Sequence, residues 1–315
     1  MNQSTIDTYL SSLQLPETFS HKGQNGKVLV IGGSELFHAA SRWSLEMVSR
    51  LVDMVFYSSV PTNNELIKAA KGEFWSGIVI ERSQLASYME EAEVVLIGPG
   101  MQRSGDTRIA SSVEEYLHTP TDAEWNQNTA VITNHLLAQY PDKKWVVDAG
   151  ALQMVDPLLL GKTTIITPHQ GELERLEGMI ESARSRDDER FVGLPNDTRP
   201  LEWLLARGVT VLLKGHTDYI YAGQEVIEIT GGSPGMTKGG TGDVLAGLVA
   251  GLYCKQTDVS SAVIASYINK KAGEELALKV GPFFNATQLL EKVPEVLWSE
   301  YQRVVRARST TPVQS

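Results

Sequence analysis

The chain has 315 residues, enough for one large α/β domain or two small ones, and its 42% hydrophobic and 21% charged residues are ordinary for a globular protein with a sizeable core. Acidic residues outnumber basic residues by 38 to 28, giving a net charge of −10, which argues against a general nucleic-acid-binding protein with a basic face. The single cysteine, Cys254, excludes an internal disulfide and a cysteine-rich zinc site, and its apolar neighbours indicate a buried thiol.

The N-terminal segment has no basic region followed by an apolar stretch, so it does not resemble a secretory signal. No window of the sequence approaches the roughly 18 to 20 continuous apolar residues that a membrane helix needs. We therefore expect a cytoplasmic protein with no membrane partner.

Short apolar runs alternate with helical stretches along most of the chain. Each run is β-branched and apolar on both faces, which is typical of a parallel strand covered by helices on both sides. The predicted strands are residues 27–31, 54–57, 78–80, 94–97, 130–132, 145–147, 164–166 and 209–213. Helical patterns occupy residues 39–52, 171–177, 201–207, 242–253 and 259–279. The alternation predicts an α/β fold with a doubly wound, mostly parallel sheet, whose ligands bind at the carboxyl ends of the strands.

Three segments depart from this alternation. Residues 218–229 alternate in hydrophobicity around a turn at Ala222-Gly223, which predicts an antiparallel hairpin at the edge of the sheet. Residues 182–199 are polar and charged, as in a surface loop or a frayed helix. Residues 306–315 are expected to be a disordered tail, so that residues 1–305 form a single domain.

The segment 231–247 is unusually rich in glycine and runs directly into a predicted helix. Glycines let backbone amides approach a ligand, and the free amides of a helix N-terminus attract anions. Residues Gly239, Gly240, Thr241 and Gly242 are therefore a candidate anion hole for a phosphoryl group. Asp243 follows in the first helical turn. An isolated aspartate there would be a helix N-cap, but the preceding glycines favour a catalytic role.

Residues 239–247, Gly-Gly-Thr-Gly-Asp-Val-Leu-Ala-Gly, resemble the anion-hole motif of ribokinase-like enzymes and, more narrowly, of the ADP- or ATP-dependent NAD(P)H-hydrate dehydratases. Four further segments agree with that family in the same order along the chain. They are Val-Ile-Gly-Gly-Ser at 30–34, Ile-Gly-Pro-Gly-Met at 97–101, Thr-Pro-His-Gln-Gly-Glu-Leu at 167–173 and Leu-Lys-Gly-His-Thr-Asp at 213–218. The resemblance covers roughly residues 27–294 and implies a ribokinase-like fold.

The resemblance also implies roles for individual residues. Asp243 would be the catalytic base. The hydrated dinucleotide would contact Ala40, Gly100, His169 and Asp243. The adenine nucleotide would contact Lys214, Gly215, His216, Thr217, Asp218 and Gly242. Glu172 either helps to hold Mg²⁺ through water or bonds to amides in its helical turn.

Structural alternatives stand beside these roles. Residues 32–34 and 98–100 could be ordinary tight turns. Lys214 could be a lysine whose aliphatic stem packs at a strand end while its charge stays in solvent.

Three departures from the family pattern bear on the substrate. The family usually has Asp-Ala-Asp-Ala-Leu where residues 148–152 read Asp-Ala-Gly-Ala-Leu, so Gly150 replaces a carboxylate. The family also commonly has a glycine and a tyrosine within residues 37–40, and Gly-Ala-Gly where residues 50–53 read Arg-Leu-Val-Asp. We expect the phosphoryl chemistry to be intact and the substrate fit to be altered.

The implied activity is that of a lyase. It would use ADP or ATP, with Mg²⁺, to dehydrate the S-epimer of hydrated NADH or NADPH in metabolite repair. The nearest alternative is a ribokinase-like kinase for a vitamin precursor, and a second is a non-catalytic nucleotide-binding protein. We expect a homo-oligomer. About 26 residues precede the first predicted strand, too few for an epimerase domain, so we expect the protein to act alone on one epimer or to rely on a separate epimerase.

Overall fold

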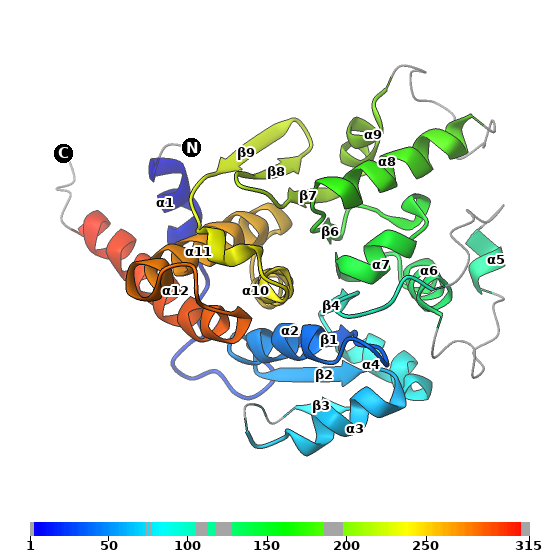
Figure 1. The fold of residues 1–315 in the computed structure, drawn as a ribbon, viewed down its shortest axis with the longest axis horizontal. Coiled ribbons are helices and arrows are strands. Elements are labelled where there is room, and N and C mark those ends of the chain that lie inside the picture. Colours follow the sequence, from blue (N-terminus) through cyan, green and yellow to red (C-terminus); the bar gives the residue numbers. More distant parts are fainter. Residues whose placement is uncertain are drawn as a thin grey trace.

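A computed structural model describes residues 3–73, 75, 77–104, 113–117, 128–185 and 198–309. Nine strands in these residues form one sheet, in the order β3-β2-β1-β4-β5-β6-β7-β8-β9 (Figure 1). The strands are β1 (Lys27–Ile31), β2 (Met54–Ser58), β3 (Ile78–Val79), β4 (Val94–Ile97), β5 (Lys144–Val147), β6 (Thr164–Ile166), β7 (Thr210–Leu213), β8 (Asp218–Ala222) and β9 (Glu225–Ile229). All pairings from β3 to β7 are parallel, and β7–β8 and β8–β9 are antiparallel. This confirms the predicted doubly wound sheet with its edge hairpin.

Helices cover both faces of the sheet and enclose two hydrophobic cores. Side chains alternate between the cores along each strand, so that Val28 and Val30 of β1 enter one core and Leu29 and Ile31 enter the other. The first core packs against α1 (Gln3–Ser11), α2 (Ala39–Ser49), α3 (Pro61–Ala69), α10 (Thr241–Tyr253), α11 (Asp258–Val280) and α12 (Ala286–Ser309). The second packs against α4 (Leu85–Glu91), α6 (Thr129–Gln139), α7 (Ala149–Met154), α8 (Gln170–Arg184) and α9 (Pro200–Ala206). Burial on both faces explains the continuously apolar strands.

Residues 130–132 are not the strand that their apolar character predicted. They belong to α6, where the side chain of Asn128 accepts a hydrogen bond from the amide of Val131 and caps the helix. Ile132, Leu136 and Leu137 then recur at helical spacing and are buried in the second core. A run of three apolar residues cannot distinguish a strand from a helix by periodicity alone.

Two other boundaries differ from the predicted ones. The hairpin turn lies at Gly223-Gln224, one residue later than expected, because Ala222 still pairs with Glu225. Helix α12 continues to Ser309, so the first part of the expected tail is helical, and residues 310–315 lie outside the described residues. Of the predicted polar loop, residues 186–197 also lie outside them, while its first residues complete α8.

The chain reverses its winding direction between β1 and β4. It runs from β1 to β2 and β3 at one edge, and from β4 through β9 on the other side. The loops after β1 and β4 therefore lie together, and the amide of Gly33 donates to the carbonyl oxygen of Pro99 at 2.7 Å. Such a switch point is where open α/β sheets bind ligands.

Residues 50–53 lie at the other end of the sheet, because they precede β2. Asp53 accepts hydrogen bonds from the amides of Gly23 (2.8 Å) and Asn25 (3.1 Å) and so fastens the segment before β1. These hydrogen bonds hold the pKa of Asp53 below its ordinary value, although burial alone would raise it. Residues 50–53 thus lie away from the carboxyl edge of the sheet, and the expectation that they bear on the substrate is wrong.

No helix within the described ranges has the length and apolarity needed to cross a bilayer.

Candidate active site

A cavity of about 720 Å³ lies at the carboxyl edge of the sheet, beside the loops that follow β6, β7 and β9 and the N-terminus of α10. Three of the segments singled out in the sequence meet there, as expected. The predicted site residues that line it are His169, Lys214, Gly215, His216, Asp218, Thr241 and Gly242. Ala40, Gly100 and Asp243 are not among its lining residues.

The turn into α10 depends on Gly240. This residue is the N-cap of the helix with φ of 96°, in the left-handed region, and a Cβ there would overlap the ring of Trp43. The hydroxyl of Thr241 fixes the loop by donating to the carbonyl oxygen of Met236 (2.6 Å) or Lys238 (2.9 Å). Gly239 faces open space, since a Cβ added there would meet nothing within 4 Å. The N-terminus of α10 thus borders the cavity through Thr241 and Gly242, where an anion hole would lie.

Asp243 lies in the first turn of α10, but it is not the N-cap, because Gly240 occupies that position. The backbone carbonyl of Asp243 accepts a hydrogen bond from the hydroxyl of Ser44 at 2.8 Å, which ties α10 to α2. Burial raises the pKa of the Asp243 carboxyl to about 7, with a further increase from the negative charge of Asp148 and a partial offset from Lys214. A carboxylate with this pKa can accept a proton at neutral pH.

Asp148, which is buried, and Lys214, which is partly buried, form an ion pair beside Asp243. The Lys214 Nζ donates to Asp148 Oδ1 at 2.8 Å, and the hydroxyl of Thr167 donates to the same oxygen at 2.8 Å. Burial alone would lower the pKa of Lys214, but Asp148, Glu172 and Asp243 together raise it above its ordinary value. Lys214 is also close to the anion hole, since a Cβ added at Gly242 would lie 3.7 Å from its Nζ. The lysine is therefore a fixed cation at the place where a phosphate would lie.

His169 is the N-cap of α8 and forms a reciprocal capping box with Glu172. Its Nδ1 accepts from the amide of Glu172 at 3.2 Å, and its own amide donates to Glu172 Oε2 at 2.9 Å. In the neutral ring Nε2 then carries the proton, and the side chain is 60% exposed. His169 can therefore donate a hydrogen bond to a ligand.

Glu172 does not fit as a direct metal ligand. Its Oε2 accepts from the amide of His169, and its Oε1 accepts from the side-chain amide of Gln153 at 2.8 Å. Across the described part of the chain, no group of three or more His, Cys, Asp or Glu side chains is placed to hold a metal ion. Glu172 therefore bonds to an amide of its own helical turn, as one of its two expected roles required. A contact to Mg²⁺ through water stays a prediction.

Asp218 shapes the 214–218 loop from within. It is buried, accepts hydrogen bonds from the amide of Gly215 (2.9 Å) and the hydroxyl of Ser266 (2.7 Å), and forms an ion pair with the Nζ of Lys270 (3.1 Å). Lys270 also donates to the carbonyl oxygens of Gly215 and His216, each at 3.0 Å. Asp218 and Lys270 together hold the backbone of the loop in position for a ligand.

Sequence reasoning missed Asn269 and Lys270, which lie in the middle of α11 and line the cavity. The side-chain oxygen of Asn269 is enclosed and has no hydrogen-bond partner in the described part of the chain. It can accept a hydrogen bond from a ligand. The available signal was two adjacent long polar residues in a helix whose other buried residues are apolar or serine.

Of the predicted substrate contacts, Ala40 and Gly100 lie at the switch point, whereas His169 lines the cavity of about 720 Å³. A Cβ added at Gly100 would come within 3.1 Å of the Cβ of Ala40 and 2.9 Å of the Phe37 carbonyl oxygen, so residues 37–40 do border this part of the site. The structure explains why position 150 is a glycine, because a Cβ there would overlap the carbonyl oxygen of Met101. An aspartate at position 150 would require this backbone to move.

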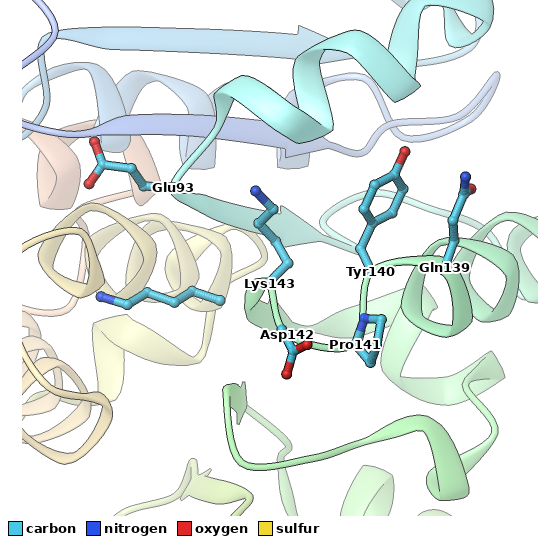
Figure 2. A pocket seen from close by; sticks show the side chains of 7 residues that line it. Glu93, Gln139, Tyr140, Pro141, Asp142 and Lys143 are labelled. Carbon is cyan, nitrogen blue, oxygen red and sulfur yellow. The ribbon is translucent and has the colours of Figure 1, made fainter.

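Another hollow, of about 540 Å³, lies at the opposite end of the sheet, where β4 and β5 begin (Figure 2). Lys143 donates to the carbonyl oxygen of Ala92 at 2.8 Å, and Lys144 donates to that of Tyr253 at 3.0 Å. Both lysines serve the fold, and we assign no site there.

Residues 28–295 match the family described as NAD(P)H-hydrate dehydratase. The ADP-dependent (S)-NAD(P)H-hydrate dehydratase of Nitrosopumilus maritimus is 31% identical over 306 residues, which cover 94% of this chain and 98% of that protein. Other curated relatives are bifunctional NAD(P)H-hydrate repair enzymes, and the chain spans about half of their length.

Solved structures show the same fold. A ribokinase-like superfamily protein of Enterococcus faecalis has a TM-score of 0.69 and 23% identity, covering 93% of this chain and 94% of that chain. The ADP/ATP-dependent NAD(P)H-hydrate dehydratase of Bacillus subtilis, co-crystallised with ATP and Mg²⁺, has a TM-score of 0.65 and 19% identity, covering 94% and 97%.

Proposed function

Because this chain belongs to the NAD(P)H-hydrate dehydratase family, we propose that its site converts the S-epimer of hydrated NADH or NADPH back to the reduced dinucleotide with ADP or ATP as co-substrate. The protein is a lyase with a ribokinase-like fold. The observation that carries the proposal is the cluster of Asp243, Lys214 and Asp148 at the N-terminus of α10, beside a cavity of about 720 Å³. We treat residues 1–305 as one catalytic domain, since the nine described strands share one sheet.

The proposed mechanism begins with Asp243 as general base. Asp243 accepts the proton of the hydroxyl on C6 of the hydrated ring while that oxygen attacks the terminal phosphoryl group of the nucleotide. The amides of residues 239–242 stabilise the negative charge of the phosphoryl group in transfer, and one such donor contributes roughly 3 to 4 kcal/mol. The ring nitrogen then expels phosphate from C6, and loss of a proton from C5 restores the double bond. A poor leaving group, hydroxide, is thereby replaced by a good one.

Lys214 and its ion pair supply positive charge for the nucleotide. Asp148 and Thr167 fix the lysine, so its ammonium group needs no reorganisation when phosphate arrives. Mg²⁺, held mainly by the phosphates of the nucleotide, would neutralise further charge. The enclosed oxygen of Asn269 offers an acceptor to the nucleotide in the same cavity.

The direct test combines the protein with hydrated NADH and with ADP or ATP in turn. We expect the absorbance of the dihydronicotinamide to return, with one free phosphate for each dinucleotide restored. A vitamin-precursor kinase would instead leave a phosphorylated product. A non-catalytic nucleotide-binding protein would bind the nucleotide and leave the hydrate unchanged.

The rate should depend on the protonation of Asp243. Because only the carboxylate can accept a proton, and burial raises its pKa to about 7, kcat/KM for the hydrate should rise with pH through a midpoint near 7 and then level off. Initial rates between pH 5.5 and 9 at fixed nucleotide concentration measure this midpoint. A profile that is flat through neutrality would contradict the assignment of Asp243 as base.

His169→Ala should raise KM for the hydrate more than KM for the nucleotide, because the exposed Nε2 is predicted to donate to the hydrate. The substitution also removes a helix cap worth about 1 kcal/mol, so His169→Asn, which retains a capping side chain, is the matched control. Steady-state kinetics on both substrates distinguish these effects. A larger change in KM for the nucleotide would assign His169 to the adenine-nucleotide cavity that it lines.

The proposal also includes an epimerase and association of the chain with copies of itself. We propose that an epimerase supplies the S-epimer, because the bifunctional relatives carry a second activity in NAD(P)H-hydrate repair. We also propose a homo-oligomer, which sedimentation of the purified chain would test.

A further inference from the structure

A buried arginine lies outside the chemistry proposed above. Arg82 is the first residue of η1 (Arg82–Gln84), a short 3-10 helix that follows β3, and it is only 6% exposed. Its Nε and Nη1 atoms are enclosed and have no hydrogen-bond partner among the residues that the structure describes. Buried arginines are normally paired with carboxylates or bonded to carbonyl oxygens, so two enclosed guanidinium nitrogens without a described partner point to a missing anion.

Arg82 lines a second cavity, of about 200 Å³, at the switch point of the sheet. The loops after β1 and β4 contribute Gly33, Ser34 and Met101 to its wall, and the first residue of α6, Thr129, closes another side. The positive end of the α6 dipole therefore adds to the charge of Arg82. The volume is below the roughly 300 to 1,000 Å³ of pockets that hold whole drug-sized ligands, so this cavity suits one charged group of a larger molecule.

The carboxylates closest to Arg82 in the sequence and in the cavity wall have other partners. Glu81 accepts from Lys68 Nζ at 3.1 Å, and Glu35 accepts from the hydroxyl of Thr62 at 3.1 Å. The hydroxyl of Tyr57, which also faces Arg82, is bonded to Ser41 at 2.8 Å. Burial lowers the pKa of Arg82 to about 10, partly offset by Tyr57, so the guanidinium is still charged at neutral pH.

The cavity is next to the loops predicted to bind the hydrate. Gly33 lines it, and a Cβ added at Gly100 would lie 3.2 Å from the Cα of Gly33. A ligand whose nicotinamide end reaches Ala40 and Gly100 could thus extend a phosphate into this cavity.

We propose that Arg82 binds a phosphate group of hydrated NAD(P)H and thereby positions the dinucleotide beside the catalytic cluster. The inference rests on the proposed function and deepens it by naming a specificity residue that neither the motifs nor the comparisons identify. The dinucleotide offers two sources of this phosphate. The pyrophosphate is common to both hydrates, whereas the 2′-phosphate belongs to hydrated NADPH alone.

The test uses Arg82→Met, which keeps the length of the side chain and removes its charge. Affinities for NADP⁺ and NAD⁺, stable probes that carry the same phosphates, are measured calorimetrically with ADP present to occupy the anion hole. We expect a loss of about 10-fold or more, because a charge-assisted hydrogen bond is removed. Loss for NADP⁺ alone identifies the 2′-phosphate, and loss for both probes identifies the pyrophosphate. KM for the hydrates should change in the same pattern, while KM for the nucleotide should not.

Thermal unfolding separates a binding role from a structural one. Burying a charge without a partner is unfavourable, so Arg82→Met should unfold at the same temperature as the wild type or higher. Arg207→Met is the matched control, because Arg207 is bonded to the carbonyl oxygens of Leu158 (2.7 Å) and Leu160 (3.1 Å) and lies away from both cavities. That variant should lose stability without a change in affinity for either probe.

Unchanged affinity for both probes in folded Arg82→Met would overturn the inference. A failure of the proposed function would look different, since the wild type would then lack turnover even if its binding of NADP⁺ depended on Arg82. A marked fall in unfolding temperature with no effect on binding would show that Arg82 is structural.

Discussion

Asp243→Asn is expected to lower kcat by a factor of about 10² or more, because the amide cannot accept the proton of the C6 hydroxyl. The substitution is nearly isosteric, and Asp243 is not the N-cap of α10, so the helix and the anion hole should persist. Nucleotide affinity, measured by calorimetry, should therefore remain close to that of the wild type. A variant that retains near-normal turnover would remove Asp243 from the mechanism.

The unfolding temperature provides the control for Asp243→Asn. The pKa of the Asp243 carboxyl determines whether the substitution raises or lowers stability at each pH. The carboxyl has a pKa of about 7 in the folded protein and about 4 in the unfolded chain, so the folded state binds the proton more tightly. Stability of the wild type therefore falls as pH rises from about 4 to 7, and asparagine avoids this loss. We expect Asp243→Asn to unfold at a higher temperature than the wild type at pH 8, and this advantage should disappear near pH 4. A variant that is less stable at pH 8 would leave its inactivity open to a structural explanation.

Lys214→Ala should have the second largest effect, on both nucleotide binding and stability. Loss of a charged donor to phosphate should weaken ADP binding by about 10- to 100-fold, with a smaller effect on the hydrate. The change also leaves Asp148, which is almost completely buried, without its cation, and breaking a buried pair costs about 3 kcal/mol or more. Calorimetry with each ligand and chemical denaturation measure the two effects. An equal loss of affinity for both ligands would contradict the assignment of this loop to the adenine nucleotide.

The double variant Asp148→Ala/Lys214→Ala separates stability from binding. Removing both members of the pair eliminates the uncompensated charge, so part of the lost stability should return. Nucleotide affinity should not return, because the cation is still absent.

The single variant Lys214→Ala should also move the pH midpoint of turnover upward, since Lys214 lowers the pKa of Asp243 in the wild type.

Much of this architecture could be predicted from local sequence. Strands such as β1 and β4 are apolar on both faces because helices cover both sides, and that pattern survives in a single sequence. The meeting of the loops that carry His169 and Lys214 at one cavity followed from the rule that loops after parallel strands share an edge. Roles within that edge were harder to predict. Asp218 and Glu172 were expected to contact ligands or metal, yet their oxygens bond to the loop and the helix that they support.

The residues that were missed depend on distant contacts. Arg82 becomes notable only because the fold encloses two of its guanidinium nitrogens without a partner among the described residues, and no local pattern reports that. Asn269 is similar, since its position in α11 reaches the cavity only after the 214–218 loop packs against the helix. The strand prediction for residues 130–132 failed for a local reason, because a short apolar run is compatible with either a strand or a helix.

The two edges of the sheet limit how copies of this chain can associate. An edge strand with free amides can recruit a strand from another molecule and so begin aggregation. Here β3 has only two residues, and β9 carries the exposed acidic side chains Glu225 and Glu228, which would repel a second copy of the same strand. Extension of the sheet between molecules is therefore disfavoured at both ends. A homo-oligomer would have to form through helices or loops, and the edge strands protect the protein from strand-mediated aggregation at high concentration.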